Sequence, residues 1–135
     1  MQGQPELLRE VERRIAIIST YSRNYQEYLR KGERAKASEM LWGIVNNLAS
    51  ILSIIHGEGP INSHAELRRF MDRLAWQVGE QVLTWYRSCE VLHAIYYHNF
   101  MDEELFEHYR SDAENLIDLL NRLVYEELGK LGIKL

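Results

Sequence analysis

The chain has 135 residues, of which 46% are hydrophobic and 27% are charged, so it has the composition of an ordinary globular protein and room for one domain, residues 1–135. Its longest apolar runs, such as residues 51–55, are far shorter than the roughly 20 residues that a membrane-spanning helix needs. Residues 1–6 lack the basic start and apolar core of a secretory signal, and we expect a cytoplasmic protein. The net charge of −4 argues against a non-specific coat on nucleic acid, because such binding depends on Lys and Arg side chains that neutralise phosphates.

The first part of the chain is expected to form two helices. The two prolines, Pro5 and Pro60, stand where helices begin or break, as a residue without a backbone N–H requires. From about residue 5 to 31, and again from about 33 to 56, apolar residues recur at steps of three and four, the spacing that lines one face of a helix. Gly32 provides a stop between the two helices.

Three further helices are expected after Pro60. Ser63 and Glu66 have the Ser-x-x-Glu spacing of a capping box, which starts a helix. The helical spacing continues to residue 78, and Gly79 indicates a break or a kink. The segment from about 80 to 99 holds the densest group of aromatic residues in the chain. A last helix, about 102 to 128, begins with acidic residues, which the dipole favours at that end.

The pattern as a whole predicts a fold without a sheet. No segment alternates strictly between apolar and polar residues, and no Asn-Gly or Asp-Gly hairpin signal occurs. Long helices joined by short linkers pack beside their sequence neighbours. We therefore expect an all-α protein, an antiparallel up-and-down bundle of four to five helices.

The signatures of common enzymes and metal sites are missing from the sequence. There is no Gly-rich phosphate loop, no His-Glu-x-x-His and no Gly-x-Ser-x-Gly, and the paired Glu-x-x-His of bundle di-metal sites is absent. The single cysteine, Cys89, cannot form an intramolecular disulfide and is expected as a small core residue. We expect no metal and no cofactor.

The helix expected over residues 80–99 carries the candidate site. Arginine is a permanent cation and histidine is the usual general acid or base, so His93 could act in that role at an RNA 2′-hydroxyl while Arg87 stabilises charge on the phosphate. The two side chains lie roughly 120° apart around the helix, so they do not meet directly within one chain. In a site shared by two subunits they would not have to. The candidate binding residues are Trp85, Tyr86, Tyr96, Tyr97 and His98. The alternative is that His93 and the tyrosines form core or dimer interface and that Arg87 is a surface charge.

Several stretches resemble a known family. Arg87 and His93 fit the Arg-x(4 to 6)-His signature of HEPN domains, small helical bundles found widely in prokaryotes. Residues 37–43, Ala-Ser-Glu-Met-Leu-Trp-Gly, resemble the Ala-Ser-Glu-Lys-x-Trp-Gly of the archaeal PaREP branch. Residues 90–97, Glu-Val-Leu-His-Ala-Ile-Tyr-Tyr, are similar to the Glu-x-Leu-His-x-Asn-Phe-Tyr of that branch. With Ser-His-Ala-Glu-Leu at residues 63–67 between them, the resemblance extends over about residues 30–125.

The resemblance implies an antiparallel helical bundle that dimerises. Many HEPN domains are metal-independent ribonucleases, often toxins paired with a small nucleotidyltransferase antitoxin, whose Arg and His line a cleft between subunits. Carried over, Arg87 would stabilise the phosphate and His93 would be the acid or base. The sequence departs from active members at Ala94, where they commonly have a polar residue near the histidine, and not all members of the PaREP branch retain the arginine.

Three hypotheses follow for the function. The first is a HEPN-like module, acting as a homodimer, that binds a nucleotide, RNA or a partner protein through its aromatic residues. The main alternative is a metal-independent HEPN ribonuclease of the toxin type that uses Arg87 and His93. The third is a non-catalytic structural dimer. The expected partners are a second copy of the chain, RNA or a nucleotide, and a nucleotidyltransferase, without a membrane.

Overall fold

A computed structural model describes residues 3–98 and 102–134, except for the side chains of residues 96–98. These ranges contain five helices and no strand. The helices are α1 (Gln4–Arg30), α2 (Arg34–Ile55), α3 (His64–Val78), α4 (Gln81–His98) and α5 (Glu103–Lys130). The all-α prediction is confirmed, and each expected helix is present to within a few residues at its ends.

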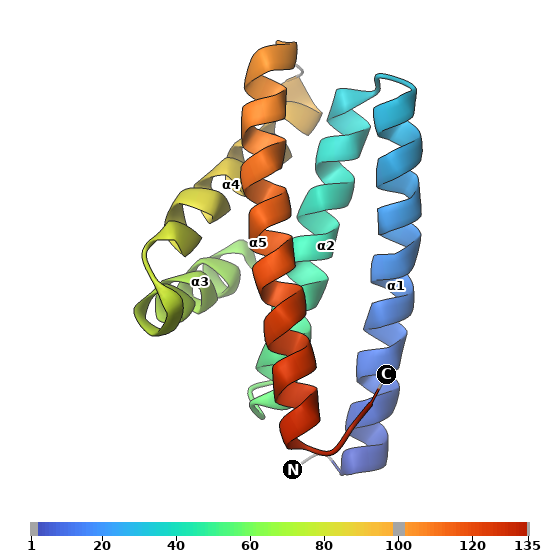
Figure 1. The fold of residues 1–135 in the computed structure, drawn as a ribbon, viewed down its shortest axis with the longest axis vertical. Helices are drawn as coiled ribbons and strands as arrows, with labels where there is room; N and C mark the ends of the chain where they lie inside the picture. The colour runs from blue at the N-terminus through green and yellow to red at the C-terminus, as the bar shows by residue number, and fades with distance from the viewer. Residues whose placement is uncertain (1–2, 99–101, 135) are drawn as a thin grey trace.

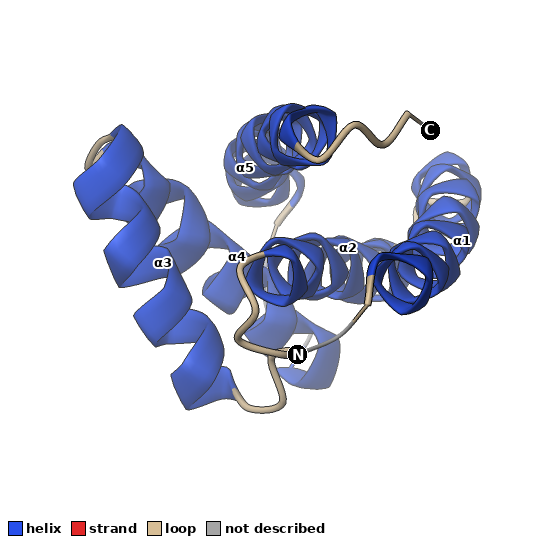
Figure 2. Ribbon diagram, turned by 90° about the horizontal axis from the view of Figure 1, so that it is seen from below, coloured by secondary structure: helices blue, strands red, loops and turns tan. Residues whose placement is uncertain are grey.

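The helices differ in how they run through the molecule (Figure 1). α1 and α2 are antiparallel and follow the long axis, as does α5, which runs in the same direction as α2. α4 returns obliquely toward the start of α5, and α3 lies across the long axis at one side. The view in Figure 2 places α3 on the side of the molecule opposite α1. Antiparallel neighbours are thus formed by α1 with α2 and by α4 with α5, whereas α3 crosses the others.

The central element is α2, which contacts each of the other four helices. Twelve of its residues are buried, which explains why apolar and small residues occupy more than one of its faces. Among the described residues it is the one helix that is long and apolar enough to cross a membrane, but 61% of that apolar window is buried within the protein. Packing against four helices therefore accounts for its composition.

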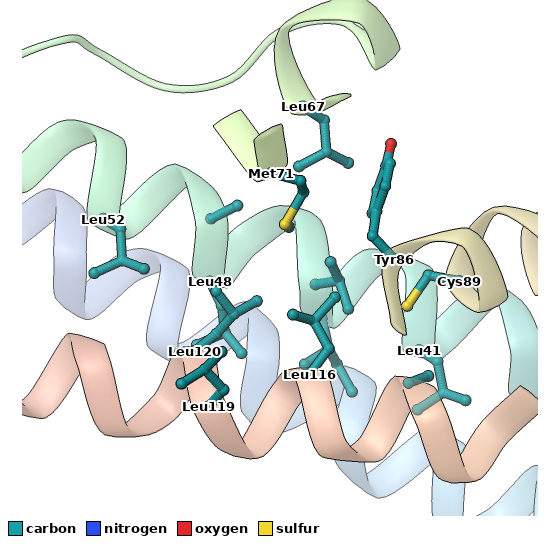
Figure 3. Packing of buried hydrophobic residues seen from close by; sticks show 14 of the residues in the cluster. Leu41, Leu48, Leu52, Leu67, Met71, Tyr86, Cys89, Leu116, Leu119 and Leu120 are labelled. Carbon is teal, nitrogen blue, oxygen red and sulfur yellow. The ribbon is translucent and has the colours of Figure 1, made fainter. Parts of the chain in front are cut away.

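All five helices contribute to one cluster of buried hydrophobic side chains, part of which is shown in Figure 3. Leu41 of α2, Met71 of α3 and Leu116 of α5 are among its most buried members, each at most 1% exposed. Cys89 of α4 is also 1% exposed, and burial raises the pKa of its thiol. The prediction that Cys89 is a core residue is therefore confirmed.

The ends of α3 follow from local sequence signals. The Ser63 hydroxyl accepts a hydrogen bond from the backbone N–H of Glu66 at 3.1 Å, as the capping box requires. The Glu66 carboxylate accepts from the N–H of Asn62 at 2.9 Å, one residue before the position that the motif predicts. At the other end Gly79 has φ +127°, a conformation that favours glycine, and it ends α3 with a full break.

Candidate functional site

Side chains from three helices gather at one place on the surface, which we call the polar-aromatic cluster. Its members are Glu39 and Trp42 of α2, His64 and Arg68 of α3, and Tyr86, Glu90 and His93 of α4. The cluster therefore joins the segments that resemble the PaREP motifs, residues 37–43 and 90–97, to residues 63–67 between them.

The indole of Trp42 is the centre of the aromatic contacts. It stacks on the imidazole of His93 with ring centroids 4.4 Å apart and an angle of 12° between the planes. The ring of Tyr86 is also close to parallel with it, at 6.2 Å and 26°. The imidazole of His64 meets the indole edge-on at 5.2 Å and 71°. Such contacts stabilise a ring arrangement by about 0.5–1.5 kcal/mol each beyond the area that they bury.

Each histidine of the cluster is held by a carboxylate. Nδ1 of His93 lies 2.9 Å from Oε2 of Glu39, and Nε2 of His64 lies 2.8 Å from Oε2 of Glu90. A guanidinium N–H of Arg68 donates to the same oxygen of Glu90 at 2.7 Å. Burial opposes the ionisation of Glu90, but the hydrogen bonds from Arg68 and His64 outweigh it, so the pKa of Glu90 is lowered.

The cluster has a buried floor and an exposed rim. Tyr86 is 2% exposed, burial raises the pKa of its hydroxyl, and that hydroxyl has no hydrogen-bond partner among the described residues. At the rim the side chains of His64 and Arg68 are 47% and 62% exposed. The side chain of His93 is intermediate, at 26%. A ligand from solvent would therefore meet His64 and Arg68 first.

The structure separates the two residues that the HEPN signature pairs. His93 belongs to the cluster and is hydrogen-bonded to Glu39 of its own chain. Arg87 is exposed on α4 and takes no part in the hydrogen bonds and ring contacts of the cluster. Trp85 is half-buried against the core, and Tyr86 forms the floor. The side chains of Tyr96, Tyr97 and His98 lie outside the described part of the protein.

Five cluster residues were not among the site residues predicted from the sequence: Glu39, Trp42, His64, Arg68 and Glu90. Four of them lie in the stretches that carry the family resemblance, so a signal was present. Glu39 and Trp42, like Glu90 and His93, are three residues apart, which places both members of each pair on one helix face. The contact between these two helix faces could not be predicted from the sequence.

The arrangement offers two kinds of chemistry. A carboxylate on one nitrogen of an imidazole fixes the orientation of the ring. A planar ring beside a guanidinium can stack on a nucleobase while the guanidinium meets a phosphate. Within residues 3–98 and 102–134, no group of three or more His, Cys, Asp and Glu side chains is placed to hold a metal ion.

Comparison with known proteins gives one match. The model of the archaeal PaREP1/PaREP8 family matches residues 13–117, a range that includes every residue of the polar-aromatic cluster. No curated protein and no solved structure matches the chain.

Proposed function

Because the chain belongs to the archaeal PaREP1/PaREP8 family, we propose that it is a HEPN-like helical module of the cytoplasm that acts as a homodimer and binds a nucleotide or RNA at the polar-aromatic cluster. The proposal extends the resemblance to HEPN domains, which rests on Arg87, His93 and the motif stretches around Trp42 and His93. Its binding surface is the exposed rim of the cluster.

The observation that carries the proposal is the fixed position of His64 beside Arg68. The His64 ring is held by Glu90 and packs edge-on against Trp42, yet almost half of its side chain is exposed. A ring that is fixed before binding loses little conformational entropy when a base stacks on it. Such stacking contributes about 1–3 kcal/mol per base. The Arg68 guanidinium, which shares an oxygen of Glu90 with His64 and is exposed, would bind the attached phosphate.

The carboxylates of the cluster suit this ligand class as well. Glu39 and Glu90 have side chains that are 28% and 23% exposed, and a carboxylate accepts hydrogen bonds from the exocyclic amino groups of bases. Because both carboxylates are paired with a histidine or with Arg68, the rim does not present bare negative charge to the phosphate. A partner protein, including a nucleotidyltransferase, is the other ligand class that we predict for this surface.

A ribonuclease that uses Arg87 and His93 is the main alternative, and the His93–Glu39 pair favours it. A carboxylate bonded to Nδ1 is the arrangement that orients a histidine for general acid or base chemistry. Since Arg87 of the same chain is not in the cluster, this mechanism requires Arg87 from a second copy of the chain near His93. A plain structural dimer is the third possibility.

Binding is tested with a labelled mixed-sequence RNA in EDTA, followed by fluorescence anisotropy. We expect His64→Ala and Arg68→Gln each to weaken binding about tenfold, which corresponds to about 1.4 kcal/mol. Arg23→Gln, which removes an exposed arginine of α1, is the matched control and should bind like the wild type. An equal loss of RNA affinity in all three variants, or no RNA binding by the wild type, would contradict the proposal. Light scattering of the same samples should give the mass of a dimer.

A further inference from the structure

A second hollow of the molecule lies apart from the polar-aromatic cluster. It is a cavity of about 120 Å³ between the C-terminal end of α2, α3 and α5. Its apolar lining consists of Leu52, Phe70, Leu74 and Leu123. An engineered cavity of about 150 Å³ with a similar lining of Leu, Ile and Phe is known to bind benzene. The space is therefore suited to a side chain that carries a single six-membered ring.

The mouth of this cavity carries charges of both signs. A guanidinium nitrogen of Arg73 lies 3.3 Å from a carboxylate oxygen of Glu58, and Nε2 of His56 lies 3.8 Å from Oε2 of Glu127. The second distance is longer than a hydrogen bond. The guanidinium of Arg73 has five N–H donors and uses one nitrogen for Glu58. Oε1 of Glu127 accepts a hydrogen bond from Nζ of Lys130 at 3.2 Å. Oε2 of Glu127 and the remaining N–H groups of Arg73 therefore retain hydrogen-bonding capacity for a ligand.

An open polar hollow of about 320 Å³ adjoins the cavity and shares Glu58 and Arg73 with it. Arg69 also lines this outer hollow. It lies one helical turn before Arg73 on α3 and forms no ion pair with any described residue. The two guanidinium groups thus border the outer hollow, while Glu127 of α5 borders the apolar cavity.

We infer that this composite hollow is a binding site for a free α-amino acid with an aromatic side chain. The ring fills the apolar cavity between Phe70 and Leu123. The α-carboxylate binds Arg73 and Arg69, because a guanidinium matches a carboxylate in shape and charge. The α-ammonium group binds Glu127. A zwitterion suits a mouth that holds both signs of charge, whereas a ligand with one charge would interact with groups of only one sign.

The ligand class is tested by calorimetry on the full chain with three probes: phenylalanine, 3-phenylpropanoate, which lacks the ammonium group, and 2-phenylethylamine, which lacks the carboxylate. We expect phenylalanine to bind at least tenfold more tightly than either analogue. Arg73→Gln should weaken the binding of phenylalanine and 3-phenylpropanoate but not that of 2-phenylethylamine. Glu127→Gln should weaken the binding of phenylalanine and 2-phenylethylamine but not that of 3-phenylpropanoate. Arg23→Gln is again the control, and thermal unfolding verifies that each variant is folded.

Three results would overturn this inference: no saturable binding of phenylalanine by the wild type, equal affinity for the three probes, or unchanged binding of phenylalanine by Arg73→Gln. The site shares no residue with the polar-aromatic cluster. Failure of the amino-acid inference would therefore leave the proposed nucleotide or RNA binding unaffected. Failure of the nucleotide or RNA proposal would likewise leave the amino-acid inference unaffected.

Discussion

The indole of Trp42 and the imidazole of His93 stack with their centroids 4.4 Å apart, although one residue belongs to α2 and the other to α4. Glu39, one helical turn before Trp42, is hydrogen-bonded to the same imidazole. The two motif stretches that resemble the PaREP branch therefore form a single contact. This contact fixes α4 against the central helix and places His93 at the edge of the candidate site.

Trp42→Ala should lower the free energy of unfolding by about 2 kcal/mol. Replacing a fully buried Trp by Ala costs about 3–5 kcal/mol, and Trp42 is only partly buried. Urea denaturation measures the change. Trp76→Ala is the matched control, since the Trp76 side chain is 92% exposed, and its effect should stay within about 0.5 kcal/mol. Equal effects of the two substitutions would contradict the packing described for Trp42.

Gly43→Ala tests the close approach of α1 to α2. A Cβ atom at Gly43 would lie 2.8 Å from Cε2 of Tyr21, so we expect a loss of about 1 kcal/mol from overpacking, although alanine favours a helix over glycine by about 1 kcal/mol. In a Tyr21→Ala background the clash is absent. There the same substitution should raise the free energy of unfolding. If Gly43→Ala is stabilising in both backgrounds, the tight contact with Tyr21 does not exist.

Glu90→Gln tests the electrostatics of the cluster through pH. Because the folded-state pKa of Glu90 is lowered from 4.5, its ionised form stabilises the protein above that value. The contribution is lost as the pH falls through the lower folded-state pKa. Urea denaturation should show the wild type more stable than Glu90→Gln by about 1 kcal/mol at pH 7, with the difference shrinking once the pH is below 4.5. Glu104→Gln, at an exposed position of α5, should show no such dependence.

Tyr25→Phe tests the polar link between α1 and α5. The Tyr25 hydroxyl donates to a carboxylate oxygen of Glu114 at 2.5 Å and accepts from a guanidinium nitrogen of Arg110 at 3.1 Å. Its removal should cost about 1 kcal/mol, the usual net contribution of one hydrogen bond. In thermal unfolding, Tyr125→Phe should be neutral because Tyr125 is 65% exposed. A neutral Tyr25→Phe would show that this link does not stabilise the fold.

The helices could be predicted from the sequence because their signals are local. Steps of three and four between apolar residues, the Ser63 cap and the glycines at 32 and 79 each act within one or two turns. The oblique position of α3 could not be predicted in this way. It depends on how the apolar face of α3 fits against α2 and α4, a relation between residues that are distant in sequence.

The candidate site was predicted only in part for the same reason. The aromatic residues of α4 were expected to act together, but Trp85 and Tyr86 are neighbours and point about 100° apart around the helix. Tyr86 therefore lies in the cluster, while Trp85 packs against the core at another position. The sequence pairs His93 with Arg87 of the same helix, whereas the observed partners of His93 are Glu39 and Trp42 of α2.

The most direct test of the central proposal measures binding and cleavage of one labelled RNA in the same EDTA-containing samples of the wild type and His93→Ala. If the chain is the binding module that we propose, the wild type should bind the RNA and leave it intact. In the His93→Ala sample the RNA should also stay intact, even where its affinity is reduced. Cleavage by the wild type that disappears in His93→Ala would contradict a non-catalytic module and assign the chain to the ribonuclease alternative.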